Sequence, residues 1–190
     1  MTGDVVGEMV EEVYRNLKFV DARNLRSQVQ GRDITITRDD LIKCFGLKDC
    51  HDDTRFVSLS RNELFSIING NDEIFPDSDV FVHEFELLIR ILYKVVRECI
   101  LPRKGSTTTV TKEDGLVILA MMKKIKIDIA KRILKRIWKD QEYRAYGNVL
   151  MEIFKFKGIS IPKKIKFPIG LKRIGEKSMH HMQIRPYKKF

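Results

Sequence analysis

The sequence predicts a mainly α-helical protein. We expect a single domain of five or six helices over residues 9–160, with one small two-stranded β-ribbon at residues 23–36 and a basic, partly disordered C-terminal tail over residues 161–190. Three observations predict this class: apolar residues recur at helical spacing along most of the chain, helix-capping residues precede several of these stretches, and β-like alternation is short. A chain of 190 residues with 43% apolar content can bury one substantial core.

The first predicted helix covers residues 9–17. Its apolar residues follow the spacing of one buried stripe: Met9, Val10, Val13, Tyr14 and Leu17. An alternating segment follows, whose alternate side chains would share one face of a hairpin: Leu25, Ser27, Val29, Ile34 and Ile36. Gly31 lies between the two halves and permits the positive φ that a tight turn needs.

Two short helices come next, each with its own start and stop signals. Thr37 is placed as an N-cap, Asp39 and Asp40 suit a helix start, and Gly46 is a natural stop. The predicted buried stripe of this helix is Leu41, Ile42 and Phe45. In the second helix Ser60 and Glu63 form a capping box and Gly70 ends the helix.

The longest predicted helix covers residues 80–100 and is closed by Pro102. Its expected buried stripe is Phe81, Phe85, Leu88, Leu92, Val95 and Cys99. Thr111 with Asp114 begins the next helix, and Asp128 caps a strongly basic one. The inward side of the basic helix is predicted as Ile129, Ile133, Leu134 and Ile137. A last helix is predicted over residues 147–156, ended by Gly158.

Charge is distributed very unevenly along the chain. Residues 1–122 hold 16 basic and 21 acidic side chains, whereas residues 123–190 hold 20 basic and 5 acidic ones. Such a field attracts polyanions, so we expect RNA or single-stranded DNA as a partner. The predicted binding residues are those on the outer face of the basic helix and in the tail: Lys131, Arg132, Lys135, Arg136, Lys139, Lys163, Lys164, Lys166, Lys172 and Arg173.

Two other interpretations of the charge stay open. The cations of the basic helix would also keep an isoleucine-rich helix soluble, without any ligand. The opposite charges of the two halves favour a protein-interaction or self-assembly module that does not bind nucleic acid. A membrane partner is not expected, because the isoleucines of the basic helix are needed for the core and no stretch is long and apolar enough to span a bilayer. We therefore expect a soluble, intracellular protein.

No catalytic or cofactor motif is apparent, so we expect a non-enzymatic protein without metal or cofactor. The P-loop, GxSxG and HExxH patterns are all missing. The acidic pairs that a metal-dependent nuclease would need lie beside helix starts and turns, where capping explains them: Asp39/Asp40, Asp52/Asp53 and Asp77/Asp79. Cys44, Cys50, His51 and His83 do not have the spacing of a zinc site, and Cys99 is the remaining thiol.

Four segments, in order, resemble a plant transposon protein domain that is associated with gypsy-type LTR retrotransposons. The segments are "VYRNLKFVDA", "VQGRDITITRDDLIKCFGL", "ILPRKGSTTTVTKEDGLVI" and "YGNVLMEIFKFKGISI", which together extend over about residues 11–162. The resemblance implies a retrotransposon-derived, gag-like or accessory role. Family members usually carry a tryptophan-bearing segment before the first motif and a long tail after the last, so the resemblance implies a fragment or a degenerate copy.

Overall fold

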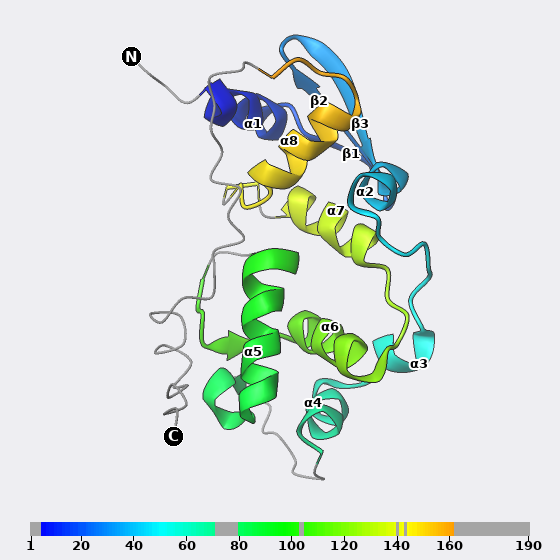
Figure 1. The fold of residues 1–190 in the computed structure, drawn as a ribbon, viewed down its shortest axis with the longest axis vertical. Coiled ribbons are helices and arrows are strands. Elements are labelled where there is room, and N and C mark those ends of the chain that lie inside the picture. The colour runs from blue at the N-terminus through cyan, green and yellow to red at the C-terminus, as the bar shows by residue number, and fades with distance from the viewer. Residues whose placement is uncertain (1–4, 71–79, 103–104, 140, 143, 162–190) are drawn as a thin grey trace, which may run out of the picture. The chain divides into compact units, whose positions relative to one another are not determined.

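A computed structural model describes residues 5–70, 80–102, 105–139, 141–142 and 144–161. Over these residues the chain is mainly helical, as predicted, with eight α-helices, one three-stranded sheet and one two-stranded sheet (Figure 1). The described residues fall into two compact units. Unit 1 contains the residues up to Asp49 and those from Asp128 on, and unit 2 contains Cys50–Ile127. The sequence did not reveal this division, in which unit 2 interrupts the sequence of unit 1.

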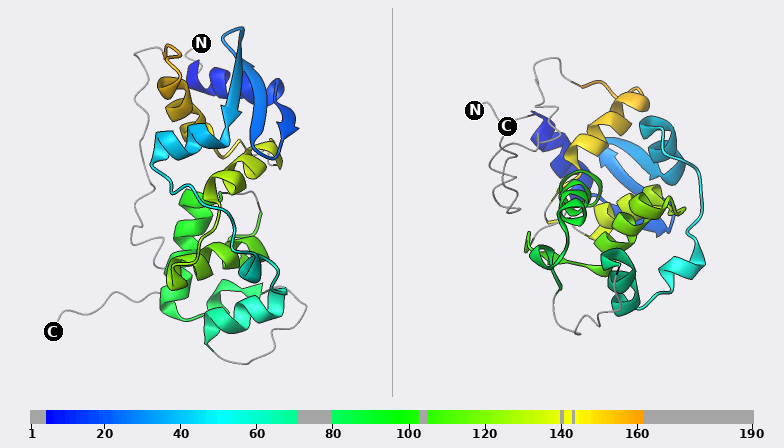
Figure 2. Two further views of the ribbon diagram at one scale, coloured as in Figure 1. Left: turned by 90° about the vertical axis from the view of Figure 1, so that its right-hand side faces the viewer. Right: turned by 60° about the horizontal axis from the view of Figure 1, so that its bottom comes forward.

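Unit 1 packs four helices around an antiparallel sheet. The elements are α1 (Val5–Arg15), β1 (Lys18–Asp21), β2 (Asn24–Val29), β3 (Arg32–Thr37), α2 (Arg38–Phe45), α7 (Ile129–Lys139) and α8 (Gly147–Phe156). The strand order is β1-β2-β3. Figures 1 and 2 show α1 and α8 on the same side of this sheet.

The predicted hairpin is confirmed in its register. Leu25 pairs with Ile36 and Ser27 pairs with Ile34, so the alternate side chains of both strands lie on the buried face. The prediction of a two-stranded ribbon is wrong, because β1 adds a third strand beside β2. All four residues of β1 are exposed, and a strand without a buried face gives no alternation of apolar and polar residues.

The turn of the β2–β3 hairpin is anchored to α1. Gln30 and Gly31 both have positive φ, 52° and 69°, as a two-residue hairpin turn of the right twist requires. The Glu12 carboxylate accepts hydrogen bonds from the backbone N–H groups of Gln30 (2.7 Å) and Gly31 (3.0 Å). The helix therefore fixes the position of the hairpin relative to the rest of unit 1.

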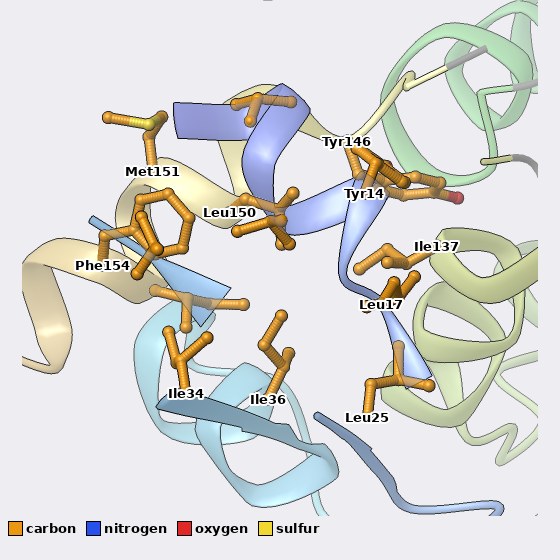
Figure 3. Packing of buried hydrophobic residues seen from close by; sticks show 14 of the residues in the cluster. Tyr14, Leu17, Leu25, Ile34, Ile36, Ile137, Tyr146, Leu150, Met151 and Phe154 are labelled. Carbon is orange, nitrogen blue, oxygen red and sulfur yellow. The ribbon is translucent and has the colours of Figure 1, made fainter. Parts of the chain in front are cut away.

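The core of unit 1 lies between the sheet and the helices. Figure 3 shows Leu25, Ile34 and Ile36 of the sheet pointing toward side chains from α7, α8 and the segment that follows α1. The whole predicted stripe of the first helix is buried: Met9, Val10, Val13, Tyr14 and Leu17. In α2, Leu41 is buried but Phe45 is 39% exposed, so the predicted stripe of this helix is wrong at Phe45.

Unit 2 is built on the packing of α4 and α5 against α6. Its elements are α3 (Thr54–Val57), α4 (Arg61–Asn69), β4 (Val80–Phe81), the 3₁₀ turn η1 (Val82–Glu84), α5 (Leu87–Val95), the π-helical turn η2 (Val96–Ile100), β5 (Thr109–Val110) and α6 (Lys112–Lys123). Gly115 lies where α6 meets α4, and a Cβ at this position would come within 2.9 Å of Phe65 and 3.0 Å of Leu64. A glycine in this helix therefore allows the two helices to approach closely.

The prediction of a single helix over residues 80–100 is wrong for the first third of this range. Val80 and Phe81 form β4 and pair with Val110 and Thr109 of β5. The helix begins only at Leu87, and its buried stripe continues from Phe85 through Ile89, Tyr93 and Val96. Leu88, predicted as core, is 58% exposed.

The predicted helix caps are confirmed. The side chains of Thr37, Ser60 and Thr111 each accept a hydrogen bond from the backbone N–H of the third residue of the helix that they start. The acidic side chain of that third residue in turn accepts a hydrogen bond from the backbone N–H of the cap residue. Gly46 and Gly70 end α2 and α4 in the left-handed conformation. Local chemistry therefore places the ends of these helices without reference to the rest of the fold.

Candidate nucleic-acid interface

The basic helix α7 begins at a buried ion pair. Asp128 accepts a hydrogen bond from the backbone N–H of Lys131 (2.9 Å), which confirms its predicted role as the cap. Its second oxygen lies 2.7 Å from Nε of Arg38, and both residues are only 5% exposed. Arg38 also contacts Asp49 at 2.7 Å. The hydrogen bonds to Asp49 and then to Asp128 raise the pKa of the Arg38 guanidinium, so Arg38 stays charged while it holds the start of α7.

The two faces of α7 differ sharply. The predicted inward face is confirmed, since Ile133, Leu134 and Ile137 are buried and Ile129 packs against the same cluster. On the opposite face Lys131, Lys135 and Lys139 are all exposed. They follow one another at four-residue steps, which advance about 6 Å each along a helix, so the three lysines form one row. We call this row the lysine stripe.

The two arginines of α7 do not belong to the lysine stripe. Arg132 is 8% exposed and Arg136 is half-buried, so the prediction that both lie on the outer face is wrong. On a helix these positions flank the stripe on the side toward Ile129 and Ile133, where the long aliphatic stem of an arginine can pack against protein. Of the five helix residues predicted to bind, the structure presents three to solvent.

An aromatic pair flanks the lysine stripe on its other side. Trp138 lies three residues after Lys135 and one before Lys139, and it is partly buried against the core of unit 1. Its ring lies 5.7 Å from the ring of Phe19 in β1, with an angle of 41° between the planes. Phe19 is 52% exposed. An open aromatic ring therefore lies beside a row of cations.

The aromatic pair of Phe19 and Trp138 is not among the residues predicted from the sequence. Trp138 is the only tryptophan in the sequence, and it follows Lys131 by seven residues, which places the two on the same side of a helix. That spacing indicates that the tryptophan lies beside the lysines of the helix. Phe19 gives no such indication, because its place beside α7 depends on the pairing of β1 with β2.

The predicted binding residues in the tail are Lys163, Lys164, Lys166, Lys172 and Arg173, and all five lie outside the described residues. Their role stays a prediction. The same holds for Asp77 and Asp79 among the acidic pairs.

Two of the acidic pairs contain a helix cap, as predicted. Asp40 completes the capping box of α2, and Asp53 caps α3 by accepting from the N–H of Arg55. Among the described residues no three His, Cys, Asp or Glu side chains are grouped so that they would hold a metal ion. Cys44, Cys50 and Cys99 are not joined in disulfide bonds, and burial raises the pKa of both Cys44 and Cys99.

No described helix has both the length and the apolar character needed to cross a membrane. Comparisons of the chain with protein-family models, with curated proteins and with solved structures found no match.

Proposed function

We propose that the protein is a non-enzymatic module that binds single-stranded nucleic acid without strong sequence preference. The lysine stripe of α7 would contact phosphates, and the aromatic pair of Phe19 and Trp138 would stack against bases. The retrotransposon-derived, gag-like or accessory role belongs to the same proposal and rests on the four segments that resemble the plant transposon domain.

The observation that carries the proposal is the combination of cations and an exposed ring on one surface of unit 1. Proteins that bind single strands without sequence preference combine cationic grooves or rows with aromatic side chains, because every nucleotide offers a phosphate and a flat base. Lys131, Lys135 and Lys139 supply the row of charges and Phe19 supplies the open ring. The lysines are held on a helix whose start is fixed by Asp128 and Arg38, so the charges keep their spacing.

The same geometry favours binding without sequence preference. Lysine contacts to phosphates do not read bases, and stacking tolerates every base. We therefore expect similar affinity for oligonucleotides of different sequence, and a strong dependence on salt concentration.

The experiment is a salt titration of binding to a fluorescently labelled single-stranded oligonucleotide, as RNA and as DNA. The variant carries Lys131→Gln, Lys135→Gln and Lys139→Gln together. The slope of log K against log salt is negative, and each lost phosphate contact reduces its magnitude by about 0.7. The slope of the triple variant should therefore be smaller in magnitude by about 2.

A matched control separates the lysine stripe from general charge. Lys43, Lys48 and Lys155 are exposed lysines of unit 1 that lie outside the stripe, and their replacement by glutamine changes the net charge equally. The proposal requires the control to keep the wild-type slope. If both variants lose the same slope, binding follows net charge and the stripe is not the site. If the intact chain binds no oligonucleotide at low salt, the proposal fails and a protein-interaction role becomes the better interpretation.

The aromatic pair is tested separately. Phe19 is largely exposed, so Phe19→Ala should leave the fold intact while it removes one stacking surface. Loss of a base–aromatic stack costs about 1–3 kcal/mol. We therefore expect affinity to fall by about fivefold or more while the salt slope stays unchanged, which distinguishes stacking from phosphate contact.

A further inference from the structure

A second cationic surface lies in unit 2, around a hollow of about 540 Å³. The hollow lies where α3 meets the end of α6, and its polar lining consists of Asp53, Arg55, Lys123, Lys124 and Lys126. Four positive charges face one negative charge here, and a volume of this size is typical of small-molecule sites. We call this feature the unit 2 hollow.

The single acid of the hollow is already engaged. The Asp53 carboxylate contacts Arg55 through two bonds, Nε to Oδ1 at 3.1 Å and Nη2 to Oδ2 at 2.8 Å. The same carboxylate also caps α3, and the backbone N–H of Asp53 donates to the carbonyl of Lys126 at 3.0 Å. Hydrogen bonding to Arg55 lowers the pKa of Asp53, and the charge of Lys126 contributes in the same direction. The three lysines are therefore the charges left to meet an anion.

Lys124 occupies a backbone conformation that favours glycine. It ends α6 with φ 55° and ψ 34°, and its N–H and that of Ile125 both donate to the carbonyl of Ala120. Helices that end in this way usually have glycine at this position, because a Cβ is strained there. α2 and α4 follow that rule with Gly46 and Gly70. Backbone strain of this kind clusters at ligand sites, and here it lies at the edge of a cationic hollow.

The rest of the lining is apolar. Phe56, Ile67 and Ile125 border the same hollow, and Ile67 is 39% exposed although it is a large aliphatic side chain. The Arg55 guanidinium lies 5.7 Å from the centre of the Phe56 ring. A flat or apolar group would therefore find a surface beside the cations.

We propose that the unit 2 hollow binds a phosphomonoester carried on an aromatic body, such as a nucleoside monophosphate or the 5′-phosphate end of a nucleic acid. The phosphate lies among Lys123, Lys124 and Lys126, and the base lies against Phe56, Ile67 and Ile125. Lysine binds phosphate as a point charge, and three lysines around one group focus the field on it. This site is independent of the lysine stripe on α7.

The test is a nuclear magnetic resonance titration of the full chain, which follows the backbone amides of residues 53–56 and 123–126. The probes are adenosine 5′-monophosphate, adenosine and inorganic phosphate. We expect the monophosphate to shift these amides and to bind at least tenfold more tightly than either of the other two. If adenosine binds as tightly as the monophosphate, or if no probe shifts these amides, the proposal is wrong.

Two variants separate a ligand role for Lys124 from a structural one. Lys124→Gly relieves the backbone strain, so it should raise the urea midpoint of unfolding while it weakens monophosphate binding severalfold. Lys126→Gln should weaken binding to a similar extent. Lys112→Gln, at the other end of α6, serves as the control and should bind like the wild type. Unchanged binding in both Lys124→Gly and Lys126→Gln would overturn the proposal.

A final comparison identifies the source of the phosphate and keeps the two proposals apart. A 5′-phosphorylated oligonucleotide should displace the monophosphate more strongly than its 5′-hydroxyl counterpart if the natural ligand is a nucleic-acid end. Displacement by neither oligonucleotide would support a free nucleotide as the source, and equal, strong displacement by both would contradict recognition of a phosphomonoester. The triple lysine variant of α7 should bind the monophosphate like the wild type, so failure of the α7 proposal would leave this result unchanged.

Discussion

Replacing Asp128 by alanine should destabilise unit 1 strongly. Arg38 and Asp128 are both 5% exposed, and their side chains meet at 2.7 Å, so the substitution leaves a buried guanidinium without its buried partner. Removing one member of a buried ion pair costs about 3–5 kcal/mol. Arg38 keeps the exposed carboxylate of Asp49, which favours the lower end of this range. Loss of the helix cap adds about 1 kcal/mol. We therefore expect Asp128→Ala to lower the free energy of unfolding by about 4 kcal/mol.

Urea unfolding, monitored by tryptophan fluorescence, measures the loss of stability in unit 1. Trp138 is the only tryptophan of the chain and lies on α7, so its signal reports unit 1. Asp128→Asn keeps an oxygen that caps the helix but removes the charge, and it should cost about 2 kcal/mol. Asp49→Asn, at an exposed partner of Arg38, should cost less than about 1 kcal/mol. If Asp128→Ala costs no more than Asp49→Asn, the buried pair does not hold α7 and the reasoning is refuted.

Two further predictions concern packing and pH. Gly115→Ala should destabilise the protein by about 1 kcal/mol, because the new Cβ meets Leu64 and Phe65. This steric clash outweighs the better helix propensity of alanine. A rise in the urea midpoint of unfolding would contradict the prediction. Burial raises the pKa of Asp40, but hydrogen bonds from Lys157 (2.8 Å) and the helix cap outweigh burial and leave the pKa below its usual value. Asp40 therefore stabilises the fold above its unfolded pKa of about 3.9, and this stabilisation is lost as pH falls through the lower folded pKa. Asp40→Asn should flatten the acid limb of a stability profile, and an unchanged limb would count against the pairing.

Much of the fold could be predicted because local chemistry decides it. The caps at Thr37, Ser60 and Thr111 place three helix starts, since a side chain two or three residues away satisfies the free N–H groups. Alternation around Gly31 fixed the hairpin, because a shift by one residue would have turned Leu25 and Ile36 away from the core.

The remaining features depend on contacts between distant residues. Val80 and Phe81 pair with residues about 30 positions later, whereas their apolar spacing alone predicts the start of a helix. Arg38 and Asp128 are 90 residues apart and meet only in the folded chain. The division into two units likewise joins segments that lie far apart in sequence.

The candidate site shows the same pattern. The cationic character of α7 is visible in the sequence, and so is the row formed by Lys131, Lys135 and Lys139. The burial of Arg132 and the contact of Phe19 with Trp138 follow from packing, which composition and spacing do not specify.

The most direct test of the α7 site is the fluorescence of Trp138 during titration with a single-stranded oligonucleotide. A base that stacks beside Phe19 also lies beside Trp138, so binding at this site should quench the fluorescence saturably at low salt. Fluorescence anisotropy of the labelled oligonucleotide gives the bound fraction independently. We predict that quenching follows the bound fraction in the wild type and in the Lys43, Lys48 and Lys155 control, and that it disappears at the same concentrations in the Lys131, Lys135 and Lys139 variant. Full binding by anisotropy with no change in the fluorescence of Trp138 would place the nucleic acid elsewhere on the chain and contradict binding at the lysine stripe.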